Sequence, residues 1–201
     1  ESVVRFQGIL CDKQLPPITK TGEATLRKQK RHIRQAVTIT GLSTPTFQQG
    51  IDNIAYLYMM FSNQFPDGKM EIWQPSSFNG HVALDAHARY LTERRLAPQE
   101  QHIEYAIGVD PHGALADLQG HDFIHGPDNY VEYLAMQHIS LTRYSPTNPI
   151  NFRVGDIVEV QLAFMAVPIK DQRYKMLVSL RGITLLDDSH RNVSTNHYTR
   201  L

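Results

Sequence analysis

The chain has 201 residues, of which 41% are hydrophobic and 20% charged, the balance of an ordinary folded protein and enough for a single globular domain over residues 1–201. Lysine plus arginine and aspartate plus glutamate both number 20, so whole-chain electrostatics gives no general attraction to polyanions. No run reaches the roughly 20 apolar residues that a membrane-spanning helix needs, and the single cysteine, Cys11, excludes an internal disulfide, which favours an intracellular protein.

Several segments have the composition of strands. β-branched and aromatic residues recur in residues 2–10, 36–40 and 69–75, and these residue types fit a pleated, half-buried surface. Further along the chain, residues 102–109 alternate between polar and apolar side chains, as a strand with one wet face does. These segments predict a chain that is rich in β-structure.

Two segments predict helices. In residues 44–65 apolar side chains recur at spacings of three and four, and Thr46 is placed to cap the first turn. Gly50 weakens that turn by up to about 1 kcal/mol relative to alanine. Residues 85–96 form the second predicted helix, with Asp85 as its cap and charged side chains on its solvent side.

The stretch QGHDFIHGPDNYVEY, residues 119–133, places two histidines and two aspartates close together. In a strand, His121 and His125 would lie roughly 13 Å apart, too far for one metal ion whose bonds to nitrogen measure about 2.0 to 2.1 Å. The segment between Gly120 and Gly126 is too short for a stable helix that would bring them together. The stretch is therefore interpreted as a short strand, a turn and a returning strand, with a metal site that combines one histidine and a distant ligand left open.

Residues 151–169 and 173–188 predict a long antiparallel hairpin. A connection at 170–172 determines which residues of the two strands face each other. Gly182 stands where the apolar residues change from even to odd positions, and it indicates a β-bulge. The predicted pairs are apolar on one face, Leu162 with Leu180, Phe164 with Val178 and Ala166 with Met176, and wetter on the other, Gln161 with Arg181 and Ala163 with Ser179.

Standard catalytic signatures are absent from the sequence, which has no G-x-G-x-x-G, phosphate loop, G-x-S-x-G, H-E-x-x-H or paired C-x-x-C motif. No catalytic residue, metal ligand or cofactor is therefore predicted. Ten histidines keep a metal-dependent enzyme as an alternative, with His102 and Glu104 spaced as ligands on one face of a strand. A module that extends a partner's sheet from an edge of the C-terminal hairpin is another alternative.

One segment is strongly basic although the whole chain is neutral. Between Lys20 and Arg34, six cations are opposed by a single carboxylate, Glu23, which gives a local charge of plus five. On a helix, the cations at 27, 30, 31 and 34 form one stripe suited to a phosphate backbone. A solvated helix face or loop, or a site for an acidic protein, is the alternative. The residues predicted to bind nucleic acid are Lys20, Arg27, Lys28, Lys30, Arg31 and Arg34.

Three phrases, DFIHGPDNYVEY, FRVGDIVEVQLAF and YKMLVSLRGITLLD, resemble a group of uncharacterised proteins of mushroom-forming fungi over residues 105–187. The resemblance implies a fungal and intracellular origin. It implies no catalytic or binding residue, because no activity is established for that group. The basic segment lies outside the matched part, so the binding hypothesis rests on its charge alone.

Together these patterns predict an α+β, β-rich fold, an antiparallel sheet that contains the long C-terminal hairpin and carries two or three helices on one face. The function that they favour is a non-enzymatic nucleic-acid-binding module, intracellular or nuclear, that has no membrane partner. A metal-dependent enzyme, an acidic protein as partner and a sheet-edge interaction module are the alternatives. The oligomeric state does not follow from the sequence.

Overall fold

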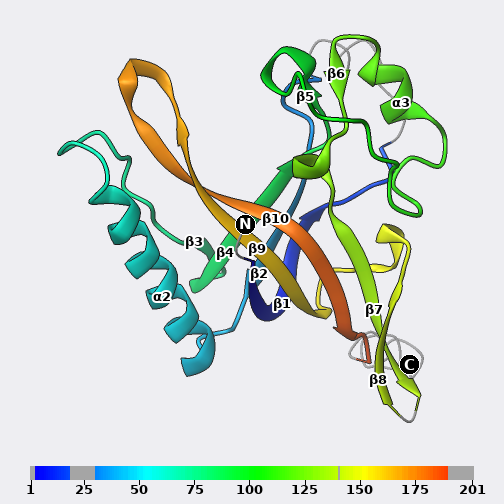
Figure 1. The fold of residues 1–201 in the computed structure, drawn as a ribbon. Coiled ribbons are helices and arrows are strands. Elements are labelled where there is room, and N and C mark those ends of the chain that lie inside the picture. The colour runs from blue at the N-terminus through cyan, green and yellow to red at the C-terminus, as the bar shows by residue number, and fades with distance from the viewer. Residues whose placement is uncertain (1–2, 19–29, 140, 190–201) are drawn as a thin grey trace.

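The computed structural model describes residues 3–18, 30–139 and 141–189 (Figure 1). Three of the predicted phosphate contacts, Lys20, Arg27 and Lys28, lie outside these ranges. Within them the chain is β-rich, as predicted from the sequence. The strands are β1 Val4–Gln14, β2 Arg34–Thr40, β3 Ser76–Phe78, β4 His81–Arg89, β5 Thr92–Glu93, β6 Phe123–Ile124, β7 Glu132–Ile139, β8 Leu141–Pro146, β9 Ile157–Pro168 and β10 Tyr174–Asp187; the helices are α2 Pro45–Ser62 and α3 Ala114–Gln119, with 3-10 turns η1 Arg94–Leu96, η2 Pro127–Asn129, η3 Pro149–Asn151 and η4 Lys170–Gln172.

Five strands close into a barrel (Figure 1). β1 pairs antiparallel with both β2 and β9, β2 pairs antiparallel with β4, and β9 pairs antiparallel with β10. A parallel contact between β10 and β4, at Ser179 and His87, closes the ring. If β1, β2, β4, β9 and β10 are counted in chain order, they follow one another around the barrel as first, second, third, fifth and fourth. This is the Greek-key arrangement of the OB-fold barrel.

The long hairpin β9–β10 follows the predicted register. The three apolar pairs and the pair of Ala163 with Ser179 are all present, and the register shifts just before Gly182, which confirms the bulge. Because of that shift, Gln161 lies opposite Gly182 and not Arg181, so this predicted pair is wrong. Ala163 and Ser179 are buried and not wet; they lie where β4 pairs with β10 to close the barrel.

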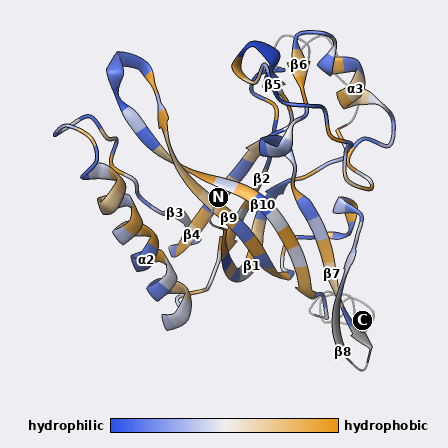
Figure 2. Ribbon diagram, in the orientation of Figure 1, coloured by the Kyte–Doolittle hydropathy of each residue, from blue (hydrophilic) through white to orange (hydrophobic). Residues whose placement is uncertain are grey.

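The hydrophobic core fills the barrel. Figure 2 shows hydrophobic residues concentrated along the barrel strands, whereas the tip of the β9–β10 hairpin is hydrophilic. In the ranges that the structure describes, no helix is long and apolar enough to cross a membrane. Each barrel strand contributes side chains that are almost fully buried, among them Leu10, Ile39, Leu84, Val160, Leu162 and Leu180.

The helix α2 confirms the prediction for residues 44–65 and packs against β1. The edge of the Phe6 ring meets the ring of Phe47, with centroids 4.9 Å apart. Gly50 lies on the same side of the helix, and a Cβ at this position would overlap the Phe6 ring. The glycine that weakens the helix locally is therefore what allows the helix to approach the strand so closely.

Replacing Gly50 by alanine is expected to destabilise the protein, although alanine is the better helix former. Overpacking a filled core costs about 1 to 3 kcal/mol, and the gain in helix propensity is at most about 1 kcal/mol. Urea unfolding followed by circular dichroism measures the net effect. Replacing the exposed neighbour Gln49 by alanine is the control, expected to change stability by less than about 0.5 kcal/mol. A Gly50 variant more stable than the wild type would contradict the close approach.

The second predicted helix, residues 85–96, is wrong. The first part of this segment belongs to β4, and β5 and η1 follow it. Leu84, Ala86 and Ala88 are buried while the residues between them are exposed or half-buried, which is the period of a strand. Ala86 and Ala88 are good helix formers, but here they are small side chains that fit inside the barrel, and tertiary pairing with β2 overrides their propensity.

Two predicted strands are also wrong. Residues 69–75 contribute only an isolated bridge, between Met70 and Tyr174. Residues 102–109 contain no strand; Gly108 has a φ of 77°, and its missing side chain leaves room for Asn148, so the chain turns where a strand would stay extended. At the start of α2, the N-cap residue is Thr44 and not the predicted Thr46, because Pro45 suits the first helical position.

The residues between β4 and β9 add a smaller unit to the barrel. Within the stretch 119–133 the predicted strand and turn are present as β6 and η2, and β7 follows. The predicted pairing of these two strands is wrong, since β6 pairs with β5 and β7 runs parallel to β10. After its bulge β10 no longer pairs with β4, and its edge from Gly182 to Leu185 becomes available to β7. The strand β8 then pairs with β7.

Candidate nucleic-acid interface

A groove of about 590 Å³ lies between the β2–β4 face of the barrel and the hairpin β9–β10. We call residues 164–178, the part of this hairpin beyond the barrel-closing contact at Ser179, the arm (Figure 1). Positive charge dominates the groove although the chain as a whole is neutral. The charged side chains that line it are Arg34, Arg89, Lys175 and Arg181, against the single carboxylate of Asp128.

Two arginines lie side by side on neighbouring strands at the floor of the groove. Arg34 begins β2 and Arg89 ends β4, and the two residues pair directly in the antiparallel register. Both are exposed, and neither forms an ion pair with a carboxylate in the described part of the chain. Like charges directly opposite each other in a sheet are destabilising. An anion bound between them would remove that repulsion.

A third cation, Lys175, approaches the two arginines from the arm, and the pKa of His87 responds to all three. Burial lowers the pKa of His87, and the positive charges of Arg34, Lys175 and Arg89 lower it further, while Asp85 acts in the opposite direction. Three strands, β2, β4 and β10, therefore bring their cations close to one imidazole ring. Because the pKa lies below its ordinary value of 6.5, this ring is uncharged at neutral pH and the arginines and the lysine carry the positive charge.

The arm presents an apolar surface to the groove. Leu177 pairs with Met165 and Lys175 pairs with Val167, and because alternate residues share a face, all four point to the same side of the arm. They line the groove together, and none of the three apolar side chains is fully buried. The groove thus has a cationic wall on the barrel and a largely aliphatic wall on the arm.

A buried asparagine fixes the backbone at the end of β4. Asn129 is 2% exposed, and its Nδ2 donates to the Arg89 carbonyl at 3.1 Å and to the Thr92 hydroxyl at 2.9 Å. Its Oδ1 accepts from the backbone N–H of Gly126 at 3.0 Å, and its own carbonyl accepts from Nε2 of buried Gln35 at 3.0 Å. The turn η2 is thereby joined to both β2 and β4, at the point from which Arg89 projects.

Arg181 has a structural partner. Its Nη1 donates to the Asp128 carbonyl at 2.7 Å and its Nη2 to the Asp128 carboxylate at 3.0 Å. The Arg181 side chain is only 10% exposed, whereas that of Asp128 is 68% exposed. This cation therefore holds η2 against β10, and the cations accessible in the groove are Arg34, Arg89 and Lys175.

Two of the predicted phosphate contacts lie in a second hollow, of about 540 Å³, beside the groove. Nζ of Lys30 stands over the Phe123 ring, 4.4 Å from its centroid. Arg31 pairs with Glu93 at 2.8 Å, and Arg95 pairs with the same carboxylate. The positive charge of Arg31 is thus partly neutralised within the protein.

The predicted helical stripe is wrong for residues 30–34. Residues 30–32 form a turn, and Arg34 begins β2. The turn separates the predicted contacts, so that Lys30 and Arg31 line the second hollow and Arg34 lines the groove. The physical reason is that β2 pairs along both edges, with β1 and with β4, and gains ladder hydrogen bonds that a short exposed helix lacks.

Two cations of the groove, Arg89 and Lys175, are not among the contacts predicted from the sequence. Arg89 was assigned to the wet side of a helix, although the alternation of Leu84, Ala86 and Ala88 with polar residues was a visible strand signal. The predicted hairpin register already placed Lys175 opposite residue 167. Which face of that hairpin looks toward β2 and β4 depends on barrel closure, and no local signal reports it.

Of the two histidines in the stretch 119–133, one is buried in the core and the other is exposed on the surface. His125 is 2% exposed, and its Nδ1 lies 2.8 Å from the Tyr90 carbonyl. Burial lowers its pKa, His102 lowers it further, and the Tyr90 carbonyl acts in the opposite direction. His121 is exposed and lines the second hollow. Among the described residues, no three His, Cys, Asp or Glu side chains gather as a metal-binding set.

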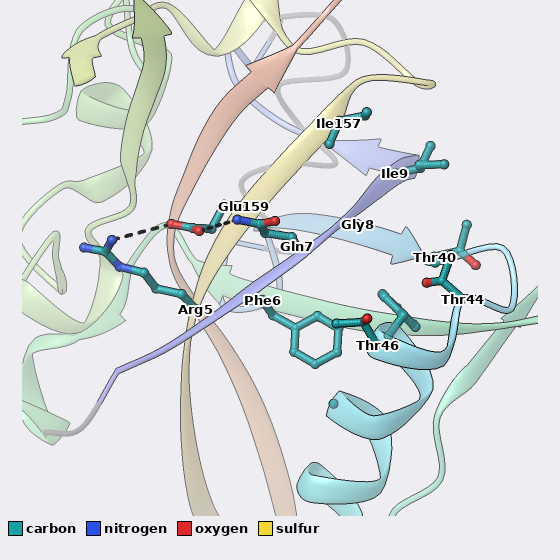
Figure 3. Close-up of a pocket in the computed structure, with 13 residues that line it drawn as sticks. Arg5, Phe6, Gln7, Gly8, Ile9, Thr40, Thr44, Thr46, Ile157 and Glu159 are labelled. Carbon is teal, nitrogen blue, oxygen red and sulfur yellow. Dashed lines mark hydrogen bonds and ion pairs between the residues drawn. The ribbon is translucent and has the colours of Figure 1, made fainter. Parts of the chain in front are cut away.

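A third hollow, between β1, β9 and the start of α2, has a different character (Figure 3). Arg5 and Gln7 both reach the Glu159 carboxylate on the neighbouring strand, the first as an ion pair at 3.7 Å and the second as a hydrogen bond at 2.9 Å. The described residues that line this hollow include no histidine, no cysteine and no second carboxylate. Its one cation among the described lining residues, Arg5, is paired with Glu159, whereas the groove has three accessible cations, so the groove is the stronger candidate.

No protein-family model and no curated protein matches the chain. The crystal structure of gp2.5, a single-stranded DNA-binding protein encoded by bacteriophage T7, is similar, with a TM-score of 0.46 and 8% sequence identity over 93% of this chain and 92% of that chain. A likeness of this size supports no functional inference.

Proposed function

We propose that this protein is a non-enzymatic module that binds single-stranded nucleic acid in the groove between β2, β4 and the arm. The observation that carries the proposal is the direct pairing of Arg34 with Arg89, two exposed arginines without a carboxylate partner in the described chain. The repulsion between these closely spaced cations destabilises the sheet locally. A ligand with regularly spaced negative charges would relieve that repulsion. Lys175 adds a third cation from the other side of the groove.

The barrel topology supports the same site. In OB-type barrels, oligonucleotides bind on the face of the second and third strands, beside the connections between strands one and two and between strands four and five. In this chain that face is formed by β2 and β4, and the connection between strands four and five is the tip of the arm. The connection between strands one and two, residues 15–33, contains Lys20, Arg27 and Lys28, which stay predicted contacts.

The second hollow extends the groove in one direction. His32 and Thr92 line the groove, and their chain neighbours Arg31 and Glu93 line the hollow. A strand that leaves the groove on this side meets Lys30, whose ammonium group has no carboxylate partner among the described residues. We assign Lys30 to a contact outside the groove, weaker than those of the paired arginines.

The dependence of affinity on salt tests the proposal. Three neutralised phosphates give a slope of about −2 in a plot of the logarithm of the binding constant against that of the salt concentration, at roughly 0.7 per phosphate for single strands. Fluorescence anisotropy with a labelled oligonucleotide measures it at constant pH. Poly-glutamate is the control ligand, and we expect it to bind much more weakly. Affinity that is independent of salt, or equal for both ligands, would contradict the proposal.

A further inference from the structure

We propose that the arm provides a wall on which the faces of unstacked bases lie, so that the groove recognises bases without reading their sequence. We call Met165, Val167 and Leu177 the aliphatic wall. The inference rests on the proposed function and adds to it where the bases go and which part of the ligand they contribute.

The aliphatic wall is open to the groove. Its three residues share one face of the arm through the pairs Leu177 with Met165 and Lys175 with Val167, and all of them line the groove. Leu96, which is 61% exposed, lies in the same lining. Apolar side chains that stay accessible to water in a cationic groove contribute to binding only if a ligand with an apolar surface covers them.

The two walls of the groove match the two sides of a single strand. The barrel wall carries Arg34 and Arg89, and the arm wall is aliphatic apart from Lys175. A single strand has the same division, with charged phosphates along one side and the flat faces of the bases on the other. A duplex hides those faces in its stack, and an acidic peptide does not have them.

Apart from His32 and His87, the uncharged polar side chains that line the groove are buried or bonded within the protein. Thr92 and Asn129 bond to each other, and Ser179 is 4% exposed. The described lining residues include no Phe, Tyr or Trp. Contact with the bases is therefore made mainly by aliphatic groups, which cannot distinguish hydrogen-bonding edges, and every base has a face that such groups can cover.

The experiment compares oligo-dT of about 12 nucleotides, within the site size of OB-type barrels, with an abasic oligonucleotide of the same length and charge. The 201-residue chain is expected to bind oligo-dT about tenfold more tightly, since burial of an aliphatic side chain contributes enough for such a factor. Oligo-dA and oligo-dC are expected within about threefold of oligo-dT, because aliphatic contact does not discriminate bases.

The double variant Met165→Gln, Leu177→Gln is expected to lose this tenfold preference while its Kd for the abasic ligand stays unchanged. Ile72→Gln is the matched control, because Ile72 is 77% exposed and does not line the groove; it is expected to keep the preference. A third variant, Leu177→Trp, adds a stacking surface and is expected to tighten oligo-dT binding alone, with quenching of the new tryptophan's fluorescence.

The outcomes separate this inference from the proposed function. Equal affinity of the wild type for oligo-dT and the abasic ligand, together with steep salt dependence for both, would overturn the aliphatic wall and leave the phosphate contacts standing. A preference that survives in the glutamine double variant would also overturn it. Absence of salt-dependent binding to either ligand would overturn both.

Discussion

Replacing both Arg34 and Arg89 by alanine is expected to weaken the binding of single-stranded nucleic acid about 100-fold at low salt, since each charge-assisted contact contributes roughly 1.5 kcal/mol. The magnitude of the salt slope is expected to decrease by about 1.4, which corresponds to the loss of two phosphate contacts. Anisotropy titrations over a series of salt concentrations measure both quantities. The variant's Tm is expected to equal or exceed that of the wild type, because the like-charge pair across β2 and β4 is removed.

The control for this variant changes the net charge by the same amount outside the groove. Arg5 and Arg153 are both exposed and do not line the groove, so replacing this pair by alanine is expected to change the affinity by less than about threefold, the size of a screened long-range effect. If the control loses as much affinity as the groove variant, net charge and not the groove is responsible. An unchanged affinity in the groove variant would remove the basis of the proposed function.

Replacing Asn129 by alanine is expected to lower the free energy of unfolding by about 3 kcal/mol, because buried groups lose their hydrogen-bond partners at a cost of about 1 to 3 kcal/mol each. Those groups are the Arg89 carbonyl, the Thr92 hydroxyl and the Gly126 N–H. A drop in Tm of roughly 10 °C follows for a chain of this size. Thermal unfolding followed by circular dichroism measures it, and nucleic-acid affinity is expected to fall as well, since Arg89 loses its backbone anchor.

An exposed asparagine provides the matched control. Asn53 lies on the outer side of α2, where its amide oxygen accepts a bond from Gln49. Its replacement by alanine is expected to change stability by less than about 0.5 kcal/mol. If the Asn129 variant were equally mild, the hydrogen bonds around this residue would not be what joins η2 to β2 and β4.

The predictions that were confirmed depend on interactions between residues close in sequence. The register of β9 and β10 follows from a short connection and from apolar residues that must face the same side. The bulge before Gly182 follows from a change of phase that any alignment of the two strands must accommodate. For the same reason the helix α2 was found from its own periodicity, although its N-cap is Thr44 and not Thr46, and it ends at Ser62 and not at residue 65.

The predictions that were wrong concern segments whose structure depends on a distant partner. Residues 85–89 have the composition of a helix but complete the barrel as β4, because β2 and β10 both pair with this strand. The strand β7 was expected to return along β6, but β10 offers it a longer edge. In both cases pairing across the chain outweighs local preference.

The candidate site shows the same division. A basic segment was evident from the sequence, but Arg34 is the only one of its described lysines and arginines that reaches the groove. Arg34 became a candidate contact because it pairs with Arg89, which lies 55 residues later in the chain. The aliphatic wall comes from a hairpin still further along the chain.

The sequence by itself determined the β-rich class, the hairpin with its bulge, the helix α2 and an excess of cations before β2, because alternation, periodicity and charge are properties of neighbouring residues. Only the tertiary structure decided that Arg34 lies opposite Arg89, that Arg31 pairs with Glu93 instead, and that the arm turns its aliphatic face toward both arginines. Closure of the barrel brings these groups together, and closure depends on pairing between strands that local sequence patterns do not encode.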